Sequence, residues 1–206
     1  MAKKKVSSTR SGSGGALDVL QKDHKQVDAL FKRFDRLEDG SPEEKEQLVR
    51  EICSMLTVHA QIEEEIFYPA LRDALEDDDE AMSLLDEADV EHSSLKSLVE
   101  QLEEADAEEE LFDAKVTVLE EYVKHHVAEE EGELFPKAKK AKELDLAALG
   151  ERLSARKAEL EPELGLTDED ETDADEGDAD RAPRAARGAI RQRSQATGRP
   201  EADNGG

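Results

Sequence analysis

The spacing of apolar residues over residues 16–161 is the feature that most limits what this chain can fold into. Apolar side chains recur there in steps of three and four, which is the period of one face of an α-helix. No long run alternates apolar and polar residues as a half-buried strand does, and Gly and Pro are scarce. The sequence therefore predicts an all-α protein.

Four such apolar stripes are present, each long enough for one helix of a bundle. They consist of Leu17, Leu20, Val27, Phe31 and Phe34; of Leu48, Ile52, Met55, Ile62 and Ile66; of Leu85, Ala88, Leu95, Val99 and Leu102; and of Phe112, Val116, Leu119 and Val123. The run Ser41–Glu44 is typical of a helix start, and Asp39-Gly40 is expected to end the helix before it. A fifth short segment, Leu146–Leu160, is expected to cover one end. The expected fold is an antiparallel up-down four-helix bundle with a short fifth helix.

Charge separates both ends of the chain from this helical region. Residues 1–15 carry basic and no acidic side chains, Asp168 to Asp180 holds nine acidic and no basic ones, and Arg181 to Arg199 holds six arginines and no acid. Such blocks bury too little apolar surface to fold. We expect a disordered basic tail (1–15), a bundle (16–161) and a disordered acidic-then-Arg-rich tail (162–206). The arginines either meet an acidic partner that the sequence does not identify, fold back on the acidic block, or stay solvated.

Composition excludes several classes of function. The 206 residues hold 28 basic and 54 acidic side chains, a formal net charge of −26. This charge repels the phosphate backbone, so nucleic acid is not an expected partner. No apolar run reaches the roughly 18–20 residues of a membrane span, and no secretory signal follows the N-terminal lysines. The single Cys53 excludes an intramolecular disulfide. We expect a cytoplasmic protein that does not bind membranes.

One histidine interrupts each apolar stripe at an inward position. The four are His24, His59, His92 and His126, out of five histidines in the chain. A single buried histidine is usually a core residue with an ordinary hydrogen-bond partner. Four of them on four helices favour a shared partner, and a metal ion satisfies several imidazoles at once.

Two glutamates follow histidines at the spacing of one helical turn. Glu63 comes four residues after His59, and Glu130 comes four after His126. Each pair therefore shares one helix face. One such pair means little in a sequence this rich in Glu, but two pairs on inward stripes are a stronger sign of a site.

The two halves of the helical region repeat this arrangement. The paired histidines are 35 residues apart in the first half and 34 in the second, and a proline follows ten residues later in both, at Pro69 and Pro136. A proline kinks or ends a helix, so its matched position suggests a required geometry. Two helical hairpins related by a pseudo-two-fold axis would place two metal half-sites face to face. Each half offers two imidazoles and one carboxylate, which suits Fe, Mn or Zn.

These residues resemble the hemerythrin-like family, the HHE cation-binding domain. The resemblance covers about residues 16–161 and includes Glu63–Pro69 with its counterpart Glu130–Pro136. It implies an antiparallel four-helix bundle with a non-haem di-iron centre, hence two Fe ions, and small ligands such as O2, NO or peroxide. It also implies that the iron ligands are His24, His59, His92 and His126, with Glu63 and Glu130 as bridges.

The chain departs from the oxygen carriers of this family in one ligand. Those proteins have five histidines, two of them four residues apart on the third helix, whereas His92 has Ala88 four residues before it and Lys96 four after. The missing ligand puts reversible oxygen carriage in doubt. Three functions remain open: a binding, sensing or redox-protection protein, which is favoured; an enzyme that decomposes hydrogen peroxide; and an iron-storage or structural metal-binding bundle.

Three further polar side chains lie close to the proposed ligands. His125 is about 100° around the helix from His126 and is expected at the surface, with a role as replacement ligand or supporting group as the alternative. Tyr122 and Tyr68 are expected in the core, with a hydrogen bond to a metal-bound ligand as the alternative.

Cys53 and two more glutamates have no proposed part in the site. Cys53 is expected to be a small core residue and not a nucleophile, since no base lies near it in sequence. Glu64 and Glu131 directly follow the proposed bridging glutamates, and the geometry of an α-helix is expected to turn both toward solvent.

Overall fold

The computed structural model describes residues 15–37 and 40–166, and the regular elements of these residues are all helical. They are α1 Ala16–Asp35, α2 Pro42–Ile62, η1 Glu63–Phe67, α3 Tyr68–Ala74, α4 Asp79–Glu103, α5 Phe112–Glu129, η2 Glu130–Leu134, α6 Phe135–Lys140, α7 Leu146–Leu160 and η3 Glu161–Leu164. α2, η1 and α3 follow one another without a break, and so do α5, η2 and α6. The all-α prediction is confirmed.

Local sequence explains where the second helix begins. The Glu44 N–H donates to Ser41 Oγ at 3.2 Å, and the Ser41 N–H donates to Glu44 Oε2 at 2.9 Å. This reciprocal cap satisfies two amides that the first turn of α2 leaves without a helical partner. The end of the first helix is predicted less well, because α1 already ends at Asp35, before Gly40.

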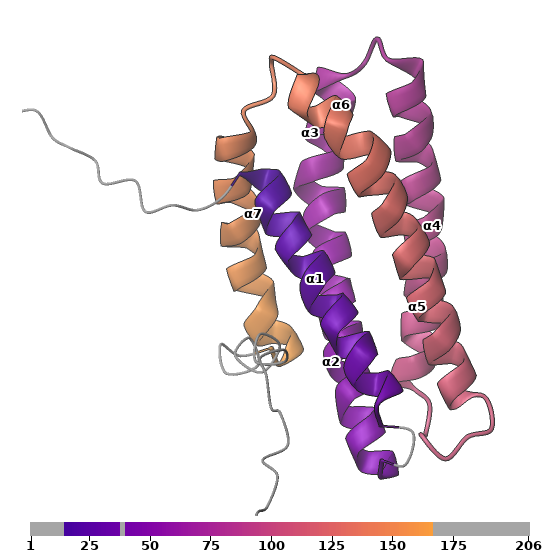
Figure 1. Ribbon diagram of the computed structural model, residues 1–206. Helices are drawn as coiled ribbons and strands as arrows, with labels where there is room; N and C mark the ends of the chain where they lie inside the picture. The colour runs from indigo at the N-terminus through magenta and orange to yellow at the C-terminus, as the bar shows by residue number, and fades with distance from the viewer. Residues whose placement is uncertain (1–14, 38–39, 167–206) are drawn as a thin grey trace, which may run out of the picture. The chain divides into compact units, whose positions relative to one another are not determined.

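The helices pack as an antiparallel up-down bundle (Figure 1). α1 packs on α2, α4 packs on α5, and α2 packs on α4. α7 lies along α1 and also contacts α2 and η1. The fifth helix therefore covers the side of one hairpin and not the end of the bundle as predicted. The reason is that Leu149, Leu153 and Leu160 bury themselves in an apolar cluster that α1, α2 and η1 share.

The core consists of two apolar layers with a polar layer between them. One apolar layer includes Phe67 and the buried leucines of α7, and the other includes Phe112 and the far ends of the four long helices. Between the two layers lie the buried polar side chains Asp23, His24, His59, Glu63, His92, His126 and Glu130. Polar groups this deeply buried need one another or a bound ion to offset their lost hydration.

The two prolines that follow the glutamate motifs do not end their helices. Each is the second residue of the α-helix that follows a single π-helical turn. In these turns the Tyr68 N–H donates to the Glu63 carbonyl, and the Phe135 N–H donates to the Glu130 carbonyl. A proline lacks the N–H that continues the hydrogen-bond ladder, so a change of register accompanies it. Both π turns begin at a proposed bridging glutamate, and functional sites are a frequent place for such turns.

The predicted tails, residues 1–15 and 162–206, lie almost entirely outside the described residues. Where the second tail is described, it packs on the bundle: Ser54 Oγ donates to the Leu164 carbonyl at 3.1 Å, and Leu166 contacts an apolar layer. The folded region therefore reaches past the predicted boundary at residue 161. Among the described residues, no helix has the length and apolar character needed to cross a bilayer.

Candidate metal centre

The structure brings the six predicted ligands together in the polar layer. His24 comes from α1, His59 from α2, Glu63 from η1, His92 from α4, His126 from α5 and Glu130 from η2, and all six are buried. Their possible ligand atoms form two overlapping groups, one of His24, His59, Glu63 and Glu130 and the other of Glu63, His92 and His126, each within 4.8 Å. Among these residues only Glu63 belongs to both groups.

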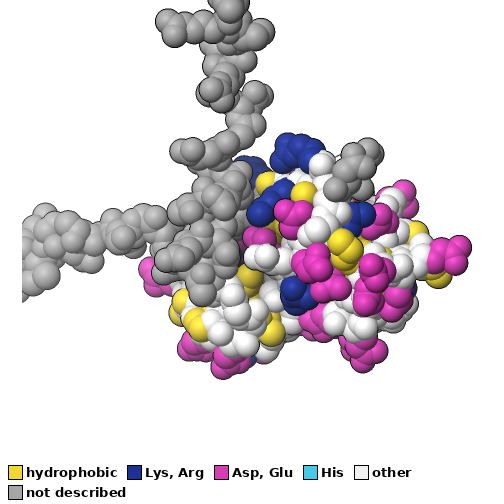
Figure 2. Space-filling view, turned by 90° about the horizontal axis from the view of Figure 1, so that it is seen from below, with side chains coloured by type: hydrophobic (Ala, Val, Ile, Leu, Met, Phe, Trp, Pro, Cys, Tyr) yellow, Lys and Arg dark blue, Asp and Glu magenta, His cyan; other side chains and the backbone are white. Residues whose placement is uncertain are grey.

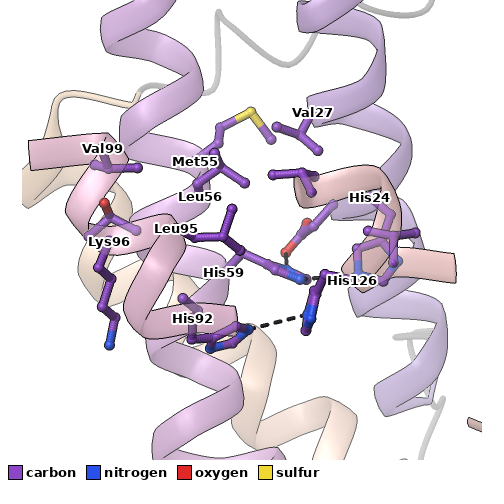
Figure 3. Close-up of a pocket in the computed structure, with 15 residues that line it drawn as sticks. His24, Val27, Met55, Leu56, His59, His92, Leu95, Lys96, Val99 and His126 are labelled. Atoms are coloured by element: carbon purple, nitrogen blue, oxygen red, sulfur yellow. Dashed lines mark hydrogen bonds and ion pairs between the residues drawn. The ribbon is translucent and has the colours of Figure 1, made fainter. Parts of the chain in front are cut away.

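The four imidazoles turn their Nε2 atoms toward the middle of the bundle in two pairs. The Nε2 atoms of His24 and His59 are 3.1 Å apart, and those of His92 and His126 are 3.3 Å apart. Figure 3 shows the four rings on one side of an apolar pocket. Two nitrogen ligands of one ion, each about 2.1 Å from it, are separated by about 3.0–3.4 Å. The spacing within each pair therefore fits one metal ion.

The two buried glutamates have oxygens that no donor among the described residues satisfies. Glu63 Oε1 lies 3.2 Å from His59 Nε2, Glu63 Oε2 lies 3.4 Å from His92 Nε2, and Glu130 Oε2 lies 3.2 Å from His24 Nε2. These contacts are close, yet Glu63 Oε1 and both oxygens of Glu130 make no hydrogen bond there. A buried oxygen left unpaired costs about 1–3 kcal/mol. The geometry therefore fits a cation between carboxylates and imidazoles.

The outer nitrogen of every imidazole, Nδ1, lies beside a further carboxylate, and these four groups are here called the outer carboxylates. The Nδ1 atoms of His24, His59, His92 and His126 lie 2.7, 3.5, 2.9 and 2.8 Å from carboxylate oxygens of Glu131, Asp23, Glu64 and Glu91, respectively. A carboxylate accepts hydrogen bonds, so each Nδ1 carries the proton and donates it. In the neutral imidazole, the form that binds a metal ion, the lone pair is then on Nε2 and faces the centre. Burial lowers the pKa of His59, but Glu63 and Asp23 outweigh this and raise that pKa well above its ordinary value, so a metal ion has to displace a proton there.

The prediction that Glu64 and Glu131 face solvent is wrong. Both are half-buried and bond a histidine of another helix, and Glu64 also accepts from Lys96 Nζ at 2.5 Å. The prediction assumed α-helical geometry, whereas both residues lie in a π-helical turn. A signal was present in the sequence. An acid precedes the first histidine of each half, at Asp23 and Glu91, and another follows each proposed bridging glutamate.

Burial and charge act in opposite directions on the two central glutamates. Burial raises the pKa of Glu63, but the imidazoles of His59, His92 and His126 outweigh this and hold that pKa well below its ordinary value. Burial and the negative charge of Glu63 together raise the pKa of Glu130 to about 7. Two carboxylates this close resist being ionised together. A bound cation removes that conflict.

The two tyrosines and the fifth histidine divide between core and surface. Tyr68 is buried as predicted, and its hydroxyl lies 3.4 Å from Glu63 Oε2 and 3.3 Å from His92 Nε2. The prediction that Tyr122 is a core residue is wrong, since it is 48% exposed. On α5 the residue that directly follows Tyr122 is the buried one. His125 lies at the surface, with its side chain 65% exposed.

Cys53 is buried in an apolar layer, as predicted. Burial and the nearby charge of Glu103 raise the pKa of its thiol to about 12. The thiol therefore stays protonated at neutral pH and is a poor nucleophile.

An apolar cavity of about 40 Å³ adjoins the four histidines. Its other walls include Val27, Met55, Leu56, Leu95 and Val99, which Figure 3 shows across from the imidazoles. A cavity needs about 10–15 Å³ of such space to hold one water molecule. The cavity therefore has room for a molecule of a few atoms beside the imidazoles.

Comparisons with known proteins point in the same direction as this geometry. The Hemerythrin HHE cation binding domain family matches residues 15–138. A crystal structure of a Hemerythrin HHE cation binding domain-containing protein from Mycobacterium kansasii is similar, with a TM-score of 0.62 and 26% identity over 73% of this chain and 89% of that one. A curated protein of Nostoc sp. (strain PCC 7120), named DNA nickase, is 33% identical over 118 residues. Those residues are 57% of this chain but only 32% of the relative's length.

Proposed function

The chain belongs to the Hemerythrin HHE cation binding domain family, and on that basis we propose that it holds two iron ions and binds or reacts with dioxygen, nitric oxide or peroxide. The observation that carries this proposal is the convergence of four imidazole Nε2 atoms on two buried carboxylates with unpartnered oxygens. The proposed ligands are His24, His59, Glu63, His92, His126 and Glu130. Nitrogen and oxygen ligands without a thiolate suit iron, manganese or zinc, and the family resemblance favours iron.

The proposed division of ligands follows the two groups of donors. Glu63 is the proposed bridge between the ions, because its two oxygens face one histidine of each pair. Glu130 is proposed as the second bridge, because neither of its oxygens has a hydrogen bond among the described residues. Six protein ligands for two ions leave coordination positions free for a small molecule.

Bound iron would supply electrons and open positions, and the side chains of this chain would control their surroundings. The outer carboxylates fix the orientation and tautomer of the imidazoles. The cavity beside the histidines has mostly apolar walls, which favour a small uncharged molecule over water. Both properties support binding, sensing or redox protection as the function.

One observation favours the enzyme that decomposes hydrogen peroxide as a second candidate. The buried hydroxyl of Tyr68 lies within 3.4 Å of Glu63 Oε2. Burial and the charges of Glu63 and Glu130 raise the pKa of this hydroxyl well above its ordinary value, so it stays protonated and is able to donate a hydrogen bond to a peroxide oxygen in the polar layer. Ligand binding and peroxide decomposition would thus use the same residues, and they differ in whether the centre converts peroxide repeatedly.

The activity in the name of the Nostoc relative is no part of this proposal. The aligned region is 32% of that protein's length. The present chain has 54 acidic and 28 basic side chains, which repel the phosphates of DNA. We therefore propose that this chain does not bind nucleic acid.

Addition of peroxide to the protein after anaerobic loading with ferrous iron separates the two candidate functions. Repeated consumption of peroxide with release of oxygen supports the enzyme. A change in visible absorption that is complete after one equivalent of peroxide or nitric oxide supports binding or sensing. If the visible spectrum of the iron-loaded protein changes with none of dioxygen, nitric oxide and peroxide, both candidate functions are contradicted.

The outer carboxylates give a sharper prediction through Glu131. Glu131→Ala is expected to weaken metal binding by about 10–100-fold, because His24 loses the partner that orients its ring, while saturating metal still fills both positions. Titration in competition with a coloured chelator measures the change. Glu133→Ala is the matched control, since Glu133 is exposed in the same π-helical turn. Equal affinities in the two variants would exclude a role for Glu131.

A further inference from the structure

Helix α7 covers only one of the two pseudo-symmetric hairpins. Val58 and Ile62 of α2 are buried in the apolar layer to which α7 contributes. These two residues lie one before and three after the second histidine of the first half. The same positions in the second half hold His125 and Glu129. Where the first hairpin is apolar and covered, the second carries polar side chains at the surface.

His125, Glu129 and Glu91 form a group of metal-binding donors on this open face, here called the surface cluster. His125 Nε2 lies 3.4 Å from Glu91 Oε1 and 3.3 Å from Glu129 Oε1. Both distances fall within the roughly 3.0–3.4 Å that separates two ligands of one cation. The side chains are 65%, 24% and 32% exposed for His125, Glu91 and Glu129, so ions in solution reach them.

The covered hairpin already has a positive charge at the corresponding place. Asp23 is the counterpart of Glu91 in the repeat, and its Oδ1 lies 2.6 Å from Nζ of Lys157 on α7. Glu91 has one oxygen 2.8 Å from Nδ1 of His126 and directs the other at His125. A cation in the surface cluster would therefore take the place that the ammonium of Lys157 has in the first half.

A narrow cavity of about 10 Å³ touches both the surface cluster and the proposed centre. Its walls include Glu91 and Glu129 from the cluster and His126 and Glu130 from the centre. Glu130 is only 3% exposed, and neither of its oxygens has a hydrogen-bond partner among the described residues. The walls of one small cavity thus include two carboxylates of the surface cluster and the buried carboxylate of Glu130. This cavity shares only His126 with the larger apolar cavity, whose walls contain none of the three surface-cluster residues.

We propose that the surface cluster is a divalent-cation site from which the metal enters the buried centre past Glu130. This inference rests on the proposed function, because it requires that the centre takes up metal. The charge of the bundle assists it, since residues 16–162 hold 42 acidic and 18 basic side chains. Figure 2 shows Asp and Glu side chains spread over the described surface on the face that it draws. Such a field raises the local concentration of cations. Metal and small ligands would then reach the centre by different routes.

The rate at which the full-length apo protein takes up Co²⁺ tests this proposal. Absorption bands of protein-bound Co²⁺, followed by stopped flow, report the filling of the centre. The variant His125→Ala/Glu129→Gln is expected to load at least about tenfold more slowly at low Co²⁺, because it lacks the step that concentrates the ion. Its final content is expected to remain two ions per chain. Glu121→Gln is the matched control, since Glu121 is exposed one turn earlier on α5 and its loss also removes one negative charge.

Each outcome of this experiment decides between the two proposals. A double variant that fills with two ions at the wild-type rate would overturn the entry site and leave the proposed function intact. Absence of Co²⁺ uptake by the wild-type centre would overturn the proposed function. Slow loading to fewer than two ions, in a variant whose circular dichroism is unchanged, would assign His125 or Glu129 to the centre itself and contradict an entry role. Equal slowing by Glu121→Gln would show that net charge, not the cluster, sets the rate.

Discussion

Replacement of Glu63 by alanine is expected to lower the metal content of the chain from two ions to nearly none. Glu63 is fully buried, and among the described residues it alone belongs to both groups of ligand atoms. Its loss therefore removes the proposed bridging ligand from both proposed ions. Elemental analysis after anaerobic loading with ferrous iron and desalting measures the effect.

The fold is expected to survive this substitution. Removal of Glu63 relieves its repulsion of Glu130 and also deletes its attraction to the imidazoles of His59, His92 and His126, so the two effects on the metal-free protein oppose each other. Circular dichroism of the variant should show unchanged helix content. Glu133→Ala is the control and should keep both ions, since Glu133 is exposed. Two ions retained by Glu63→Ala would show that Glu63 is not a ligand.

The second large effect is expected in an apolar layer, away from the centre. Phe112→Ala should lower the free energy of unfolding by about 3–5 kcal/mol, because Phe112 is 1% exposed and its loss leaves a cavity. Denaturant unfolding of the metal-free protein, followed by circular dichroism, measures this. The variant should still bind two metal ions, because the polar layer lies between Phe112 and the other apolar layer.

The residue before Phe112 supplies a matched control for this prediction. Leu111 is 61% exposed, so Leu111→Ala should change the free energy of unfolding by less than about 0.5 kcal/mol. A loss of similar size in both variants would mean that burial does not distinguish the two positions. That result would contradict the division of the core described above.

Most of the fold was predictable because burial imposes a period on the sequence. Every stripe residue named for the four long helices faces the core or its margin, since a helix that buries one face must repeat apolar residues every three or four positions. The position of α7 was not predictable in the same way. Its leucines show that one face is buried, but they do not show whether that face meets the end or the side of the bundle.

The candidate site was predictable as far as α-helical geometry holds. The four histidines and two glutamates lie on inward stripes, and the structure places them together in one layer. The partners Glu64 and Glu131 were missed because a π-helical turn changes which side chains face inward. Tyr122 was misplaced because its position one turn before His126 is close to the inward face but just outside it. The acids repeated beside four of the proposed ligands, His24, Glu63, His92 and Glu130, were the feature that could have identified the outer carboxylates.

The iron content of the full-length protein after anaerobic loading tests the central claim most directly. The claim is that six buried side chains, two imidazoles and a carboxylate from each half, hold two ions. It predicts two iron ions per chain in the wild type and a loss of iron in His59→Ala and in His126→Ala, one from each half. A wild-type chain that retains no iron after desalting, or iron that survives both substitutions unchanged, would contradict it.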